Sequence, residues 1–179
     1  NMKRIFSLLL FSLSISATLA QDPAEDPLTW SASRKLTWSD YKASPNPKSD
    51  AAATTSTSLS IDYHISSSQF SYTIKSWFSR SRSWGRHKTD YILSHEQGHF
   101  DIAEIYARKL HQRMSAYQFN KNNYQKELNR IYNEVADEKA AIQRQYDRET
   151  RHSIDEVKQA EWLKKISQIL EELKEYADY

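Results

Sequence analysis

Residues that interrupt helices are almost missing from the second half of this chain. Of its 179 residues, four are proline, all before residue 48, and two are glycine, Gly85 and Gly98. Proline and glycine are the residue types that a helix interior tolerates least. Their distribution therefore predicts a helical second half, and the earlier residues must supply any other secondary structure.

Alternating side chains predict an antiparallel hairpin ahead of the helices. In residues 54–65, and again in 69–78, apolar and aromatic residues occupy every second position, and a serine turn at 66–68 joins the two ranges. A period of two is typical of strands with one buried face. We also expect the 69–78 strand to offer an edge to an extended peptide. The rest of the β part (28–78) is expected to hold short aromatic strands at 28–30 and 36–38 and a loop at 43–53.

Three amphipathic helices are expected after the basic linker at 79–88. Apolar residues recur with helical spacing in three segments: from Thr89 or Asp90 to about Tyr117, from Tyr124 to about Thr150, and from a capping box at Ser153–Glu156 to about Tyr176. Long helices with short joints pack antiparallel. The predicted fold class is therefore α+β, a small N-terminal antiparallel hairpin or sheet packed on three long helices. One domain of residues 28–179 is expected, with its helical part at 89–177.

The first twenty residues are predicted to be a signal peptide. Lys3 and Arg4 form a basic start, an apolar run follows, and Thr18-Leu19-Ala20 fits a cleavage site. The run is too short to span a membrane comfortably. We therefore expect export to the periplasm or the medium. A disordered leader at 21–27 would follow, and no transmembrane segment is expected in the mature chain.

The charge of the mature chain argues against nucleic acid as a partner. Taking Lys3 and Arg4 from the 25 basic residues leaves 23, against 23 acidic residues, so no net positive charge would attract a polyanion. The chain has no cysteine, so no disulfide supports the fold. A basic linker such as 79–88 is usually solvated, and a role in holding a substrate carboxylate is the sharper alternative.

One short motif in the first predicted helix carries recognisable chemistry. His95-Glu96-Gln97-Gly98-His99 has the form H-E-x-x-H. Residues four apart lie on one face of a helix, so both imidazoles can reach one metal ion. The glutamate after the first histidine can act on a water at that ion. Because Ala103 and Leu110 share the same face, we expect the motif to face the core and to bind Zn²⁺, with Glu96 as general base.

A third zinc ligand must come from another element, and two residues compete for that role. If the joint between the first two helices centres near residue 119, Glu138 lies almost level with His99. Glu138 also interrupts an apolar stripe at a core position, where a carboxylate needs a partner. His152, where the second helix ends, is the rival. Two histidines and one carboxylate would leave a fourth position for water.

Two residues near the expected site are candidates for catalysis. Tyr146 and His152 could each support a developing oxyanion. Gly98 costs a helix about 1 kcal/mol relative to alanine, which indicates close approach by a substrate or another backbone, or simply tight helix packing. Glu104 points away from the metal face and is expected to pair with Arg108 one turn later.

Further segments carry a family resemblance. They are His95–Glu104 with Tyr106–Leu110, Arg34–Tyr41, Ser83-Trp84, Tyr146-Asp147-x-x-Thr150-x-His152 and Gln159-x-x-Trp162. Together they resemble the bacterial domain-of-unknown-function 922 family, which is described as secreted and predicted to hold zinc-dependent proteases. The chain departs from the family pattern at Ser153, where many members are expected to have glycine. The resemblance implies a zincin-like fold on the gluzincin plan, in which a glutamate from a later helix completes H-E-x-x-H.

The expected function is that of an exported zinc-dependent hydrolase, a metallopeptidase that acts on peptide or protein substrates. Zinc would be held by His95, His99 and Glu138, and Glu96 would move the proton. The alternative is a non-catalytic cell-envelope module that binds partners or holds a structural zinc. A closed site with four protein ligands, Glu138 and His152 both included, would favour that alternative.

Overall fold

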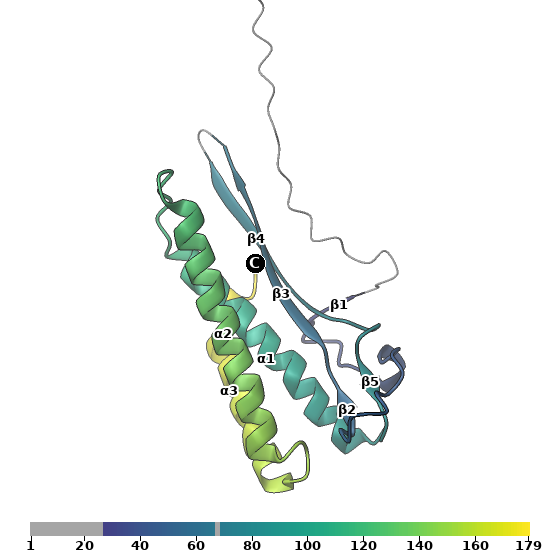
Figure 1. Cartoon of the computed structure of the whole chain (residues 1–179). Coiled ribbons are helices and arrows are strands. Elements are labelled where there is room, and N and C mark those ends of the chain that lie inside the picture. Colours follow the sequence, from purple (N-terminus) through teal and green to yellow (C-terminus); the bar gives the residue numbers. More distant parts are fainter. Residues whose placement is uncertain (1–26, 67–68) are drawn as a thin grey trace, which may run out of the picture.

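The computed structural model describes residues 27–66 and 69–179, which form a small antiparallel sheet and three long helices (Figure 1). The predicted α+β class is confirmed. The predicted signal peptide at 1–20 and all of the leader except Pro27 lie outside the described residues. In the described ranges, no helix is both long and apolar enough to cross a membrane.

The predicted hairpin forms strands β3 (Thr57–Ile65) and β4 (Phe70–Phe78). They pair antiparallel along their whole length, with Thr57 opposite Phe78. Strand β1 (Leu28–Thr29) pairs with the last two residues of β4, which places β4 between β1 and β3. At Trp77 and Phe78 the strand at 69–78 is therefore central and not the expected edge, and β3 lies at the other edge of the sheet.

The segment before the hairpin is extended but does not continue β3. Strand β2 (Ala53–Thr54) pairs instead with β5 (Trp84–Gly85) and forms a separate two-stranded sheet. Arg86, in the basic linker, braces this segment by donating to the carbonyl oxygen of Ala51 at 3.2 Å. The aromatic segment at 36–38, predicted as a strand, leads instead into the short 3-10 helix η1 (Trp38–Asp40). The Asp40 carboxylate starts this turn by accepting from the backbone of Thr37.

The three helices follow the predicted bounds closely. They are α1 (Asp90–Ser115), α2 (Tyr124–Thr150) and α3 (Glu156–Glu172), and a 3-10 turn, η2 (Lys174–Tyr176), ends the chain's helical part. Thr89 caps α1 as predicted, since its hydroxyl accepts from the Ile92 amide. The cap of α3 is Asp155 and not Ser153, because Ser153 has a φ of 68° and belongs to the turn before the helix.

Helix α1 lies between the sheet and the other two helices (Figure 1). It is buried around much of its circumference, which is typical of a helix covered on several sides. The main core joins apolar residues of all three helices to the sheet, and its members include Leu59, Ile74, Ile102, Leu110, Leu128, Val135, Trp162 and Ile166. A helix held from several sides is a rigid platform for side chains that need fixed positions.

The N-terminal segment docks directly on the H-E-x-x-H turn of α1. The side chain of Gln97 accepts from the backbone of Leu36 at 2.7 Å and donates to Asp101 at 2.7 Å. The indole of Trp30 also donates to Asp101, at 2.7 Å. Gln97, between the histidines, and Asp101, just after them, therefore anchor a distant segment, while the histidines themselves face α2.

Candidate metal centre

The H-E-x-x-H motif lies in the second turn of α1 and faces inward, as predicted. His95 and Glu96 are buried, with 3% and 4% of their surface exposed. The rings of His95 and His99 lie edge to face with their centroids 4.9 Å apart. Residues four apart on one helix thus bring two imidazoles to one point.

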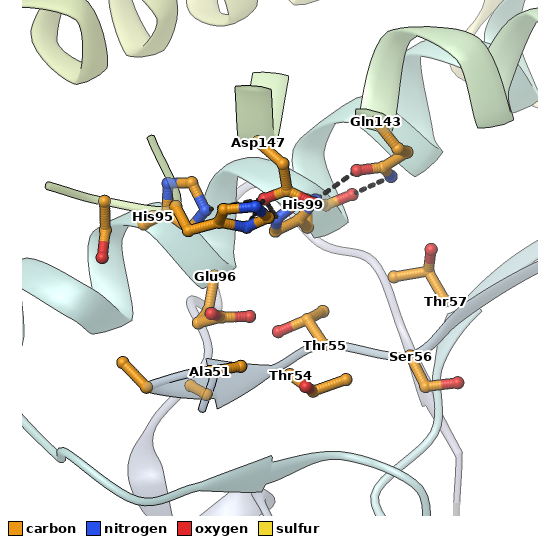
Figure 2. A pocket seen from close by; sticks show the side chains of 14 residues that line it. Ala51, Thr54, Thr55, Ser56, Thr57, His95, Glu96, His99, Gln143 and Asp147 are labelled. Carbon is orange, nitrogen blue, oxygen red and sulfur yellow. Dashed lines mark hydrogen bonds and ion pairs between the residues drawn. The ribbon is translucent and has the colours of Figure 1, made fainter. Parts of the chain in front are cut away.

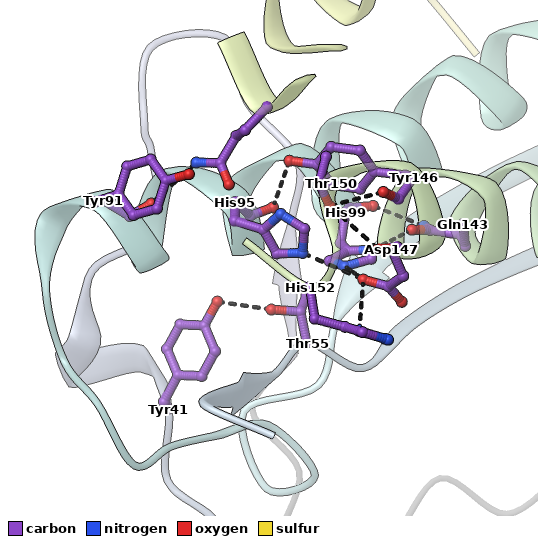
Figure 3. A network of polar contacts seen from close by, with 11 residues as sticks. Tyr41, Thr55, Tyr91, His95, His99, Gln143, Tyr146, Asp147, Thr150 and His152 are labelled. Carbon is purple, nitrogen blue, oxygen red and sulfur yellow. Dashed lines mark hydrogen bonds and ion pairs between the residues drawn. The ribbon is translucent and has the colours of Figure 1, made fainter. Parts of the chain in front are cut away.

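The carboxylate that meets both histidines is that of Asp147, near the end of α2. Its Oδ1 lies 3.2 Å from Nε2 of His95 and 3.0 Å from Nε2 of His99 (Figure 3). Sequence reasoning did not name Asp147 as a site residue, although it stood inside one of the family segments. The available signal was its place beside Tyr146, on the face of α2 that turns toward α1.

Gln143 fixes the orientation of His99. Its amide nitrogen donates to the carbonyl oxygen of His99 at 2.8 Å, so its Oε1 is turned toward Nδ1 of the same residue and accepts from it. Because Nδ1 donates to Gln143, Nε2 is the ring nitrogen that faces Asp147 and that a neutral His99 would offer to a metal. Partners of this kind set the tautomer and ring position of metal-ligating histidines.

Opposite charges stabilise each other inside this cluster. Burial disfavours a charged imidazole, but the hydrogen bond and negative charge of Asp147 outweigh it, so the pKa of His99 is raised. Burial also acts to raise the pKa of Asp147, but the hydrogen bonds from His95 and His99 hold that pKa well below its usual range. Asp147 is therefore an ionised carboxylate between two imidazoles.

Three donor atoms lie close enough together to bind one ion. One atom from each of His95, His99 and Asp147 lies within 4.8 Å of the others. Tetrahedral ligands at about 2.0–2.2 Å from zinc stand about 3.3–3.6 Å apart, slightly more than the two nitrogen–oxygen distances of 3.2 and 3.0 Å. The donor types also suit zinc, so these residues fit such an ion.

Glu138 is not brought to the histidines. Both of its carboxylate oxygens accept from Arg113, at 2.7 and 2.9 Å, and its side chain is 42% exposed. The cause is the register of the two helices: the contacts of His99 with Gln143 and of His95 with Asp147 centre the α1–α2 hairpin near residue 121. A joint shifted by about two residues moves the opposing residue by about one turn.

Tyr146 supports the histidines from behind and lies outside the cleft lining. Its ring stacks on His95 with centroids 4.5 Å apart, and its hydroxyl donates to the His95 carbonyl oxygen at 3.2 Å. A Cβ at Gly98 would stand 2.5 Å from that hydroxyl, which explains the glycine by close packing. The expected contact of Tyr146 with an oxyanion is not supported by this position, because its hydroxyl is buried against α1.

His152 lies at the mouth of the site and remains accessible. Its Nδ1 stands 3.5 Å from the Oδ1 of Asp147, and its side chain is 74% exposed. Three successive residues, Arg151 to Ser153, have left-handed backbones with φ of 50°, 52° and 68°. Position 153 thus has the conformation that favours the glycine expected in many family members. The turn places His152 beside the cluster without making it part of the three-donor group.

A cleft of about 450 Å³ opens in front of these residues. One wall is the extended segment 51–57, and the other comes from α1, α2 and the 152–153 turn (Figure 2). Glu96 faces the cleft, and among the described residues its Oε2 is buried without a hydrogen-bond partner. Buried carboxylate oxygens are rarely left unpaired, so this one is available to a group that enters the cleft.

The comparisons with known proteins give a family and no individual relative. A family model with the description "Bacterial protein of unknown function (DUF922)" matches residues 15–153, a range that includes both histidines and Asp147. No curated protein and no solved structure matches the chain. Because the family model covers most of the sequence, the chain belongs to the DUF922 family.

Proposed function

We propose that this chain is an exported zinc-dependent hydrolase, and specifically a metallopeptidase. The observation that carries the proposal is the convergence of His95, His99 and Asp147 at a cleft, beside Glu96, whose Oε2 is buried without a partner among the described residues. Perturbed titratable groups in a cleft are typical of functional sites. Buried carboxylate oxygens normally have a hydrogen-bond partner within the protein, and in the described part of the chain the Oε2 of Glu96 has none.

In this proposal His95, His99 and Asp147 hold Zn²⁺, and Asp147 takes the place that the sequence suggested for Glu138. Bound zinc would supply a Lewis acid and a water of lowered pKa. Gln143 keeps His99 in the tautomer that offers Nε2, and Tyr146 holds the ring of His95 in position. The described residues offer three donors, which leaves room for a fourth ligand and supports catalysis over a closed structural site.

Glu96 is proposed as the general base. Its carboxylate accepts a proton from the attacking water while the new carbon–oxygen bond forms at the peptide carbonyl. The same proton then passes to the amide nitrogen as the carbon–nitrogen bond breaks, so the leaving group departs as a neutral amine. His152, accessible at the cleft mouth, is proposed to donate a hydrogen bond to the carbonyl oxygen as charge develops on it.

The extended segment 51–57 is proposed to guide the substrate. It faces the histidines across the cleft (Figure 2). From Thr57 onward the edge of β3 is covered, because Lys139 donates to the Thr57 carbonyl oxygen and Tyr132 to that of Leu59. A peptide backbone lying along the residues before Thr57 would add to the β structure there, as extended ligands do at open strand edges.

The central test combines metal content with turnover. The mature chain, residues 21–179, would be purified, its zinc measured by mass spectrometry, and its cleavage of a denatured protein mixture mapped. We expect one bound zinc, and we expect Glu96→Gln to keep the metal while losing at least about 100-fold in turnover. Glu161→Gln, at an exposed glutamate on α3, is the matched control. Absence of zinc, or turnover retained in Glu96→Gln, would overturn the proposal.

Export is proposed from the first twenty residues alone. If they form a cleaved signal peptide, N-terminal sequencing of the protein collected outside the cytoplasm should begin at Gln21. Protein that stays in the cytoplasm with an intact start would refute this part and leave the chemistry unaffected.

A further inference from the structure

A second cavity opens next to the cleft, on the other side of the turn at 151–153. It has a volume of about 540 Å³. The two cavities share four lining residues: Ala51, Ala52, His152 and Ser153. Residues 51–52 and 152–153 therefore lie where the cleft meets the second cavity, and a chain that leaves the cleft past them would enter the second cavity.

Exposed apolar side chains gather around this second cavity. Tyr91, Ile92 and Ile154 line it. Tyr91 precedes His95 by one turn of α1 (Figure 3). Ile154 is 67% exposed and Tyr91 36%, and Val157, three residues after Ile154, is 69% exposed. Of the five large hydrophobic residues exposed in the described ranges, these three lie at this end of the molecule, and such gatherings mark binding sites more often than single residues do.

The walls of the cavity are held in place by a buried amide. Gln159, which is 1% exposed, donates to the carbonyl oxygen of Tyr91 at 3.2 Å and to the hydroxyl of Ser94 at 3.0 Å. These two bonds tie the first two turns of α1 to the first turn of α3. The apolar surface is therefore formed before any ligand arrives, which lowers the entropic cost of binding.

We infer that the cavity lined by Tyr91, Ile92 and Ile154 is a subsite for an aliphatic or aromatic side chain of an extended peptide. The peptide bond to be cleaved would lie at the His95–Asp147 cluster. The inference rests on the proposed peptidase function and names its substrate class. The lining also includes one acidic and one basic residue, Asp50 and Arg151. Their charges offset each other, so we expect the apolar surface, and not net charge, to determine which side chain binds.

The test measures binding apart from turnover. Blocked alanine hexapeptides, each with a single leucine at a different position, would be added to the zinc-loaded Glu96→Gln variant and to the metal-free chain. The protein would carry ¹³C-labelled isoleucine methyl groups. We expect at least one leucine peptide to shift the Ile92 and Ile154 methyl signals and to bind about tenfold more tightly than the all-alanine peptide, because burial of a leucine side chain is worth that much.

Two variants test whether the preference for leucine comes from this cavity. Ile154→Ser should remove most of the preference for leucine, and it should leave the fold intact because the side chain is largely exposed. Phe119→Ser, at an exposed aromatic residue outside both cavities, should keep the preference. Equal binding of leucine and alanine peptides, or a preference unchanged in Ile154→Ser, would overturn the subsite.

The subsite and the peptidase proposal fail in different ways. If the chain cleaves peptides but neither cleavage nor binding depends on an apolar residue, the subsite is refuted and the function stands. If no cleavage occurs while leucine peptides still shift the Ile92 and Ile154 methyl signals, the subsite stands as a peptide-binding pocket and the function is refuted.

Discussion

The ring of Tyr146 stacks on the ring of His95, with centroids 4.5 Å apart and planes 17° from parallel. The same tyrosine fills the space that a Cβ at Gly98 would need, with its hydroxyl 2.5 Å and its Cζ 2.9 Å from that position. The glycine in the H-E-x-x-H motif thus lets an aromatic side chain of α2 reach the first histidine. Helix packing and the geometry of the site are coupled at this point.

Gly98→Ala is expected to destabilise the protein although alanine is the better helix former. Alanine should gain about 1 kcal/mol in helix propensity, whereas overpacking against a buried ring costs about 1–3 kcal/mol. We expect a net loss of about 1 kcal/mol in the free energy of unfolding and weaker zinc binding, measured by urea titration and by competition with a chelating dye.

The double variant Gly98→Ala/Tyr146→Phe is the control for that prediction. It removes the hydroxyl that makes the closest contact and should recover part of the lost stability. If Gly98→Ala alone proves more stable than the parent chain, the ring of Tyr146 can move away at no cost. The coupling between packing at Gly98 and the position of Tyr146 on His95 is then refuted.

Periodicity in the sequence was enough to predict the hairpin and the three helices. The alternation in 54–65 and 69–78 corresponds to β3 and β4, and the absence of proline beyond residue 47 corresponds to α1, α2 and α3. These features follow from local side-chain spacing, which a sequence displays directly. The motif in α1 was found in the same way, because both of its histidines belong to one helix.

The residues that lie opposite the motif could not be predicted as accurately, because they depend on the register between two helices. A joint assumed near residue 119 pointed to Glu138, whereas the hairpin centres near residue 121 and brings Gln143 and Asp147 to the histidines. Helix bounds read from a sequence carry an error of a few residues. At a helical hairpin this error doubles, and a shift of one turn is enough to bring a different residue opposite the histidines.

A pair of conservative variants tests whether Asp147 or Glu138 is the third zinc ligand. Asp147→Asn keeps the side-chain size but removes the charge between the two imidazoles, and zinc affinity should fall by at least about 100-fold, more than for a residue that only supports a ligand. Glu138→Gln should leave zinc affinity unchanged, because its carboxylate is paired with Arg113 at the surface. Competition with a chromophoric chelator would measure the zinc affinity of both variants. A larger loss of affinity in Glu138→Gln than in Asp147→Asn would identify Glu138 as the ligand instead.

Gln143 is expected to act on zinc through His99. Gln143→Leu removes the acceptor at Nδ1 and the donor to the His99 carbonyl oxygen. Zinc affinity should then fall by about 10–100-fold, the range for partners that orient a ligating histidine. Gln145→Leu, on the same helix but bonded to Glu149 at the surface, should bind zinc normally. Equal losses of zinc affinity in the two variants would mean that substitutions on α2 weaken binding in general, and not through the orientation of His99.

Lys139 should make the free energy of unfolding depend on pH in the alkaline range. Burial disfavours its charge and lowers its pKa from 10.5 to about 8, while its ammonium donates to the Thr57 carbonyl oxygen at 3.2 Å. Between about pH 8 and 10 the unfolded chain holds this proton and the folded chain has lost it, so the lysine's contribution to stability rises with pH. Below about pH 8 both states are protonated and the contribution is constant.

Comparison of the parent chain with Lys139→Met isolates this effect. The parent should gain stability relative to the variant by about 1 kcal/mol or more between pH 7 and pH 9.5, measured as the difference in free energy of unfolding. Lys126→Met, at an exposed lysine of the same helix, should show no such change. If the difference between the parent chain and Lys139→Met does not change with pH, Lys139 keeps its charge at the covered edge of β3, and water reaches the junction between α2 and residues 51–57.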